Sequence, residues 1–156
     1  MNIFFLDYNL TKCAEYHVDR HVVKIIIEVC SMLATAYPQG VAPYKRTHAN
    51  HPMSVWVRES RPNFLWTIDY GKALCKEYTY RYNKRHKSEN VLDWYANNIP
   101  EFARTEPTSP PRCFGTLKGV IPETSCIVSD YRNYYLLGKQ HLFSWKGRER
   151  PDWINN

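Results

Sequence analysis

Residues 15–33 read EYHVDRHVVKIIIEVCSML, and this stretch predicts a helix that is apolar around most of its circumference. Each helical residue advances by about 100°, so residues three and four apart share a face. One narrow face collects apolar side chains: Val18, Val22, Ile25, Val29, Met32 and Ala36. A band beside it collects polar ones: His17, His21, Lys24 and Glu28. We therefore expect a buried helix whose polar band lies at the border of the core, where charges need partners.

The polar band suits metal binding only weakly. His17 and His21 are four residues apart and can chelate, and the later HANH motif adds His48 and His51. However, an H-x-x-x-H pair without the intervening catalytic glutamate is a weak signal. Lys24 would also repel a cation. The sequence predicts no metal site and no cofactor.

Two other chemistries use the same band. Acid–base or lyase catalysis would employ His21, Glu28 or Lys24. Anion recognition would place the histidines and Lys24 against phosphate oxygens. A third interpretation is a solvated helix edge with one Lys24–Glu28 ion pair, in the weaker of the two orders. Anion recognition needs the fewest assumptions because positive charges predominate in the band.

The remaining segments predict a mainly α protein. The start, NIFFLD, suits a short edge strand or a buried extended segment. A helix from Asn9 or Thr11 to about Tyr37 follows, then a second at 62–86, a third after Ser88 and a last one at 123–137. Residues 100–122 are rich in Pro, Ser and Thr and predict a long ordered loop. We expect a single domain over residues 1–156, a compact helical bundle with a short N-terminal extended segment and a long irregular Pro-rich loop.

Composition narrows the class of protein. The net charge is +6, and 12 tyrosines and 5 tryptophans bring aromatic residues to 15%. Cations and flat rings together suit a nucleotide or nucleic-acid ligand. The five cysteines form no C-x-x-C pair, which fits a reducing compartment. No signal peptide or membrane-length apolar run is present, so we expect a cytoplasmic protein without a membrane partner.

Cations and rings also recur outside the first helix. In THANHPMSVWVRES, an extended segment would place Trp56 and Arg58 on the same side, where they could hold a base and a phosphate. Arg132 and Lys139 flank NYYLLG. The alternative for Trp56 and Arg58 is a core ring and a surface charge. The predicted ligand-binding set is His17, Arg20, His21, Lys24, Glu28, His48, His51, Trp56, Arg58, Arg132 and Lys139.

Three pieces of the chain resemble the pyrimidine-dimer DNA glycosylases of the endonuclease V type, found in large tailed phages and some bacteria. They are MNIFFLD with EYHVDRHVVK, HANHPMSVWVRE with LWTIDYGKALCKEYTYRYNKRH, and RNYYLLGK with RPDW. The resemblance implies a compact helical fold. It also implies an enzyme that flips a base out of the duplex, attacks the sugar with its N-terminal α-amine and uses a helix-borne glutamate.

The resemblance also locates departures from the family. Arg20 and His21 fall where the family has Arg-Glu, so His21 replaces the catalytic carboxylate, and Lys24 falls where the family has a DNA-contacting arginine. Glu28 is a substitute further along the helix. Methionine is normally removed only before a small residue, so we expect the α-amine to stay on Met1, ahead of Asn2.

The sequence thus predicts a phage-type nucleotide-binding protein that retains the binding residues without catalysis. Its suggested role is to sequester a nucleotide immune signal, a cyclic nucleotide or an ADP-ribose derivative, in the host bacterial cytoplasm. The alternative is a DNA glycosylase with AP-lyase activity on damaged or modified bases, with His21, Glu28 and Lys24 as catalytic residues. A homo-oligomer is compatible with either.

Overall fold

A computed structural model describes residues 1–154, and its regular structure is entirely helical over that range. The prediction of a mainly α bundle with an irregular Pro-rich loop is confirmed. The α-helices are α1 (Leu10–Tyr16), α2 (Asp19–Ala34), α3 (Pro52–Glu59), α4 (Arg61–Tyr82), α5 (Glu89–Asn97) and α6 (Ile127–Gly138). Two short 3₁₀ helices, η1 (Gly115–Leu117) and η2 (Gln140–Leu142), flank α6.

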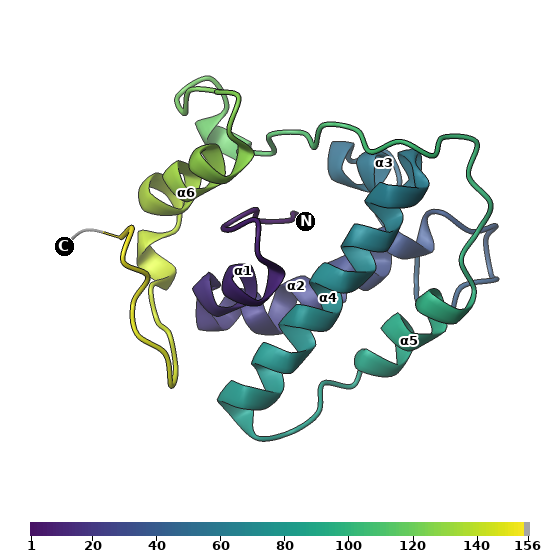
Figure 1. Ribbon diagram of the computed structural model, residues 1–156, viewed down its shortest axis with the longest axis horizontal. Coiled ribbons are helices and arrows are strands. Elements are labelled where there is room, and N and C mark those ends of the chain that lie inside the picture. The colour runs from purple at the N-terminus through teal and green to yellow at the C-terminus, as the bar shows by residue number, and fades with distance from the viewer. Residues whose placement is uncertain (155–156) are drawn as a thin grey trace.

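Helix α4 is the centre of the bundle and packs against α1, α2, α3 and α5 (Figure 1). Its close approach to two of these depends on Gly71, because a Cβ there would lie 3.0 Å from Leu92 of α5 and 3.1 Å from Val29 of α2. The helix ends at Asn83, which adopts the left-handed conformation (φ 52°) that commonly terminates helices. That cap ends the helix before the predicted residue 86.

The N-terminal segment, residues 1–6, lies inside the molecule rather than at its edge (Figure 1). It forms no strand, and the alternative of a buried segment without regular structure is the one observed. Ile3 and Leu6 are 0% exposed. Phe4 stacks on Tyr134 of α6, whereas the neighbouring Phe5 stacks on Trp66 of α4. The segment therefore joins the α4 side of the core to α6.

The predicted continuous helix from Asn9 or Thr11 to Tyr37 is wrong, because it breaks between α1 and α2. His17 and Val18 have extended backbone conformations (ψ 135° and 153°). Both are held by tyrosines from distant helices: His17 Nε2 lies 2.8 Å from the hydroxyl of Tyr70, and Val18 N–H donates to the hydroxyl of Tyr135. Tertiary hydrogen bonds therefore override the local helical pattern.

The predicted extended segment around Trp56 is also wrong, because these residues form α3. The side chain of His51 accepts a hydrogen bond from the backbone of Met53, and Pro52 occupies the first turn, where proline is well tolerated. On a helix, Trp56 and Arg58 point in different directions.

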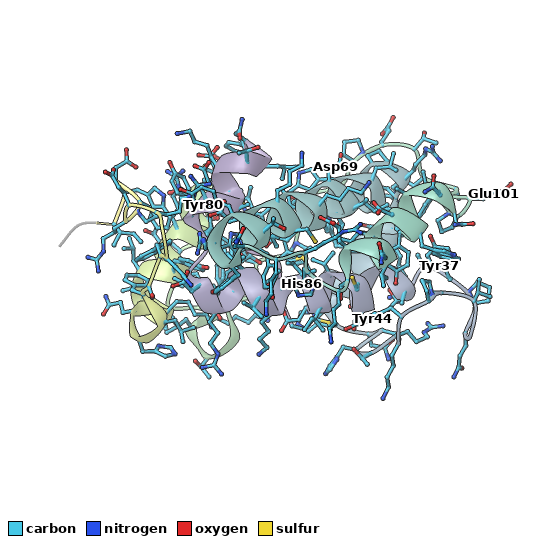
Figure 2. All side chains as sticks on the ribbon, turned by 90° about the horizontal axis from the view of Figure 1, so that it is seen from below. Tyr37, Tyr44, Asp69, Tyr80, His86 and Glu101 are labelled. Carbon is cyan, nitrogen blue, oxygen red and sulfur yellow. The ribbon has the colours of Figure 1, made fainter. Side chains whose placement is uncertain are left out.

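The chain after α5 wraps the body as an irregular strap. Thr108 in the Pro-rich segment accepts a hydrogen bond from the indole of Trp56 and exchanges hydrogen bonds with Asn63. The last helix starts at Ile127 rather than at the predicted residue 123, after a turn in which Thr124 bonds Asp130. At the far end the tail packs near Tyr80, opposite the end where Tyr37 lies (Figure 2).

A buried ionic network fastens α4 to the α1–α2 junction. Arg81 has a fully buried side chain that donates to Glu77, to Asp19 and to the carbonyl of Glu15. Arg148 of the tail adds two further bonds to Glu77. The charged groups of Arg81, Glu77, Asp19 and Arg148 thus each lie close to a group of opposite charge, as a buried ion pair requires.

Candidate functional site at the N-terminal segment

The N-terminal segment, α2, the start of α3 and α6 enclose a cavity of about 270 Å³, which we call the N-terminal pocket. Its walls combine residues from the chain start, from α2, from the cap of α3 and from the region around α6. They are Met1, Asn2, Phe4, His21, Lys24, Ile25, Glu28, His51, Cys113, Gly115, Tyr134 and Lys139. Five of the predicted binding residues therefore meet here: His21, Lys24, Glu28, His51 and Lys139.

Glu28 is paired with the first residue of the chain. The Met1 nitrogen lies 3.6 Å from its Oε1 atom, and the backbone N–H of Asn2 donates to its Oε2 atom at 3.0 Å. Lys24, one helical turn earlier, adds an exposed cation at 3.8 Å. Only 13% of the Glu28 side chain is exposed. An amine and a carboxylate are thus held together in the wall of this pocket, with most of the carboxylate side chain shielded from water.

Asn2 fixes the position of this pair. Its side-chain amide donates to the carbonyl of Cys113 at 2.7 Å, and its side-chain oxygen accepts from Ile3 N–H and from the hydroxyl of Tyr131. Asn2 is buried, so these bonds are protected from water. The backbone next to the Met1 nitrogen is therefore rigidly placed against Glu28.

His21 forms part of the pocket wall. Its Nδ1 atom lies 2.6 Å from the hydroxyl of Tyr135, and its ring stacks on Phe4 with centroids 4.5 Å apart. Burial, followed by repulsion from His17 and the nearby cations, lowers the pKa of His21 to about 3. The ring is therefore uncharged at neutral pH.

His51 contributes from the cap of α3. Its Nδ1 atom accepts the backbone N–H of Met53 at 3.1 Å. Burial, and then repulsion from the N-terminal amine and His48, lowers the pKa of His51. Two uncharged imidazoles consequently line a pocket that also contains an amine.

Lys139 supplies a cation from the end of α6. Its ammonium lies 5.1 Å from the ring centroid of Tyr134 and 5.8 Å from that of Phe4, within the range of cation–π attraction. Burial and then repulsion from Lys24 lower the pKa of Lys139. Lys24, Lys139 and the Met1 amine outnumber the single carboxylate, so the pocket favours an anionic ligand.

The structure places His17 away from the pocket, although the helical pattern grouped it with His21. It is 0% exposed, and its two ring nitrogens bond the carbonyl of Cys13 (2.6 Å) and the hydroxyl of Tyr70 (2.8 Å). Burial lowers the pKa of His17 to about 4. Since both nitrogens have protein partners, His17 is a core residue.

Three other predicted residues also have structural partners elsewhere. Trp56 is 6% exposed and forms part of a separate apolar cavity of about 290 Å³ with Trp66 and Phe5. Arg58 donates to the carbonyl of Ala49 and to Thr35. Arg132 bonds Leu6 and Asp7 and lies over the rings of Tyr16 and Trp153.

Arg20 and His48 are exposed and lie outside the pocket wall, although both influence the histidines electrostatically. The remaining wall residues were not in the predicted binding set: Met1, Asn2, Phe4, Ile25, Cys113, Gly115 and Tyr134. Only the apolar character of the chain start indicated that this segment would be buried.

Within residues 1–154, no cluster of three or more His, Cys, Asp or Glu side chains is arranged to hold a metal ion. All five cysteines are free thiols. No helix in the described range is both long and apolar enough to cross a membrane.

A profile of the family described as pyrimidine dimer DNA glycosylase matches residues 1–90, more than half of the 156-residue chain. The match covers Met1, His21, Glu28 and His51, and so confirms the predicted resemblance. Comparison with curated proteins and with solved structures gave no match. The chain therefore belongs to the pyrimidine dimer DNA glycosylase family.

Proposed function

We propose that this protein is a DNA glycosylase with lyase activity, in which the Met1 α-amine is the nucleophile and Glu28 its proton acceptor. The observation that carries the proposal is the distance of 3.6 Å between the Met1 nitrogen and Glu28 Oε1. A chain whose first residue is Met1 has its α-amino group at this point. His21 stands where the family has its catalytic glutamate. In this proposal Glu28, two turns later on α2, provides the carboxylate instead.

The proposed reaction begins with attack by the α-amine on C1′ of a deoxyribose. The nitrogen lone pair forms a bond to C1′, and the bond from C1′ to the base breaks, so that its electron pair leaves with the base, which takes up a proton. Glu28 accepts the proton that the amine loses. Ring opening gives a Schiff base, and loss of a proton from C2′ expels the 3′ phosphate and cuts the strand.

The size and charge of the pocket suit a single extruded nucleotide. A cavity of about 270 Å³ is small for a ligand site and holds roughly one nucleotide, not a stretch of duplex. Enzymes that act on a base within a duplex flip it into such a pocket. Lys24 and Lys139 at the walls can bind the flanking phosphates.

The test is borohydride trapping on duplex DNA that contains an abasic site or has been irradiated with ultraviolet light. We expect a covalent protein–DNA adduct, strand cleavage, and an adduct mass that maps to the Met1 peptide. Glu28→Gln should lose activity, while Glu123→Gln, on an exposed loop, should not. An adduct on Lys24 or Lys139 would contradict the role of Met1, and absence of any adduct would contradict the lyase.

A second candidate is the nucleotide-binding protein without catalysis that the sequence predicts. The excess of cations over carboxylates in the pocket supports it, because a free nucleotide phosphate would be attracted in the same way. Calorimetry against cyclic nucleotides and ADP-ribose compounds distinguishes it from the lyase. A dissociation constant below about 100 μM for one of these nucleotides, without covalent trapping on DNA, would favour this candidate.

A further inference from the structure

The two histidines of the N-terminal pocket share an arrangement of hydrogen bonds. In His51, the Nδ1 atom faces the backbone N–H of Met53, 3.1 Å away. A backbone N–H can only donate, so Nδ1 must present a lone pair. A neutral imidazole with a lone pair on Nδ1 carries its hydrogen on Nε2.

His21 reaches the same state through Tyr135. The oxygen of Tyr135 accepts the backbone N–H of Val18 at 3.3 Å, and lies 2.6 Å from His21 Nδ1. If Nδ1 carried the hydrogen, the hydroxyl hydrogen of Tyr135 would have no acceptor among the described contacts, although Tyr135 is 0% exposed. A buried donor without an acceptor costs free energy. Tyr135 therefore donates to Nδ1, and the hydrogen of His21 is on Nε2.

His17 shows the opposite arrangement and serves as an internal comparison. Its Nδ1 atom lies 2.6 Å from the carbonyl of Cys13, which can only accept, so Nδ1 carries the hydrogen. Its Nε2 atom then accepts from Tyr70. Both nitrogens of His17 are satisfied within the protein, whereas the hydrogen bond of the His21 ring among the described residues is through Nδ1. Its Nε2 atom is not among the fully buried atoms without a partner, and the ring lines the pocket, so Nε2 is accessible from it.

We propose that His21 and His51 are fixed, uncharged N–H donors that bind acceptor oxygens of the ligand in the N-terminal pocket. The ligand would present a hydrogen-bond acceptor oxygen to these donors, either a carbonyl of a pyrimidine or an oxygen of a phosphate. The inference rests on the proposed function only in taking this pocket as the place where the ligand binds.

The same hydrogen-bond arrangement excludes two roles for the rings, general base and metal ligand. A general base or a metal ligand needs a lone pair on the nitrogen that faces the ligand. In both rings that nitrogen carries hydrogen, so His21 does not replace the lost glutamate as a base. Because the rings are uncharged, they add donors without adding repulsion toward the Met1 amine, Lys24 and Lys139. The lowered pKa values of both histidines agree with this state.

The first experiment observes the tautomers directly in the full chain labelled with ¹⁵N-histidine. Two-bond correlations between ring nitrogens and ring hydrogens distinguish the tautomers, and His21→Phe and His51→Gln assign the signals. At neutral pH we expect hydrogen on Nε2 in His21 and His51, and on Nδ1 in His17. A cationic ring, or hydrogen on Nδ1, at His21 or His51 would overturn the proposal.

The second experiment titrates wild type and His21→Phe with thymidine, inorganic phosphate and thymidine 5′-monophosphate. Phenylalanine keeps a ring beside Phe4 but removes both the Nε2 donor and the Nδ1 atom that accepts from Tyr135. The controls are Tyr135→Phe, which loses the same Tyr135–His21 bond but keeps the imidazole and should bind the probes more tightly than His21→Phe, and His141→Phe at an exposed site. We expect about tenfold weaker binding to His21→Phe. Weaker thymidine binding identifies a base carbonyl as the acceptor, and weaker phosphate binding identifies a phosphate oxygen.

Equal affinities in wild type and His21→Phe, or no binding of any of the three probes, would overturn the ligand role of the donors. These outcomes are separate from those of the trapping assay. If His21 binds a probe but the protein forms no adduct with DNA, this inference is upheld and the lyase is contradicted. If an adduct forms but His21 and His51 carry hydrogen on Nδ1, the lyase is upheld and this inference is contradicted.

Discussion

The nitrogen of Met1 faces the carboxylate of Glu28 at 3.6 Å, where the buried chain start meets the polar band of α2. Asn2 holds this arrangement from the backbone side, through its bonds to Glu28 and Cys113. The position of the amine is therefore set by the main chain and not by a flexible side chain. Any change that moves the chain start should act on this pair first.

Glu28→Gln should reduce adduct formation by about a hundredfold or more, the usual contribution of a positioned acid–base group. The amide keeps the shape and the bond from Asn2 N–H but cannot accept a proton from the amine. Single-turnover trapping on abasic duplex measures the effect. A rate equal to that of Glu123→Gln would show that Glu28 takes no part in the reaction.

One additional glycine ahead of Met1 should abolish trapping while leaving the Met1 nitrogen as an uncharged amide. The new amine would be displaced by about 3.5 Å from its position beside Glu28. Binding to uncleaved duplex, measured by fluorescence anisotropy, should remain because Lys24 and Lys139 are unchanged. Intact mass should confirm the first residue in both proteins, and undiminished trapping by the extended chain would contradict the role of the α-amine.

Stability should fall as the pH is lowered from about 6.5 toward 4, because burial lowers the pKa of His17 to about 4 and that of His21 to about 3. The unfolded chain binds protons that the folded chain excludes, so the free energy of unfolding decreases by roughly 2 kcal/mol per histidine near pH 5. Chemical denaturation across this range measures it. His21→Phe should give a shallower slope than wild type, and His141→Gln the same slope.

The pH range in which the histidines reduce stability lies above the range in which the buried carboxylates do so. Hydrogen bonds outweigh burial and lower the pKa values of Asp19 and Glu77. Their contribution is therefore present above their ordinary values of 3.8 and 4.5 and is lost as the pH falls below them. A stability curve that stayed flat from pH 6.5 to about 5 would contradict the buried neutral histidines.

Tyr70→Phe should lower the free energy of unfolding by about 2–4 kcal/mol. It removes the hydroxyl that accepts from Phe4 N–H and bonds His17 Nε2, and so leaves two buried groups without a partner. Tyr134→Phe is the matched control because its hydroxyl makes no hydrogen bond among the described residues, and the change should be within about 0.5 kcal/mol. Equal effects of the two substitutions would contradict the role of the Tyr70 hydroxyl.

Arg81→Met should destabilise by about 3–5 kcal/mol, since it leaves Glu77 and Asp19 without their buried partner. Arg85→Met, on the same stretch of chain but with an exposed pair to Glu89, should have a much smaller effect, because water screens that pair. Urea unfolding of both variants makes the comparison. A small loss in Arg81→Met would show that the network is not needed for stability.

The sequence predicted α2 because its apolar and polar side chains repeat at helical spacing among residues that are close in the chain. Val22, Ile25 and Val29 are buried as expected, and His21, Lys24 and Glu28 share the pocket because residues three and four apart lie on one face. The prediction failed for His17 because Tyr70 and Tyr135 hold the chain extended at residues 17 and 18. These tyrosines are distant in sequence, so the spacing of residues within 15–33 could not predict their contacts.

The region around Trp56 shows the same limit for a strand-like pattern. VWV has β-branched residues that favour extended structure, but the His51 cap and Pro52 start a helix whose apolar side packs on α4. Trp56 is then a core ring, as the alternative interpretation supposed, whereas Arg58 is half-buried and bonds Ala49 and Thr35 instead of being a free surface charge. The pairing of Met1 with Glu28, and the position of Lys139 opposite them, depend on how α6 closes over the chain start, which only tertiary packing determines.

The buried chain start also constrains the order of events during synthesis. Phe4 is synthesised long before Tyr131, Tyr134 and Tyr135, the three α6 rings on which it packs. Contacts between the two ends of a chain form slowly because a long loop must close. The α6 side of Phe4 therefore stays uncovered until that helix has formed, and an apolar ring exposed during folding is a site where aggregation can begin.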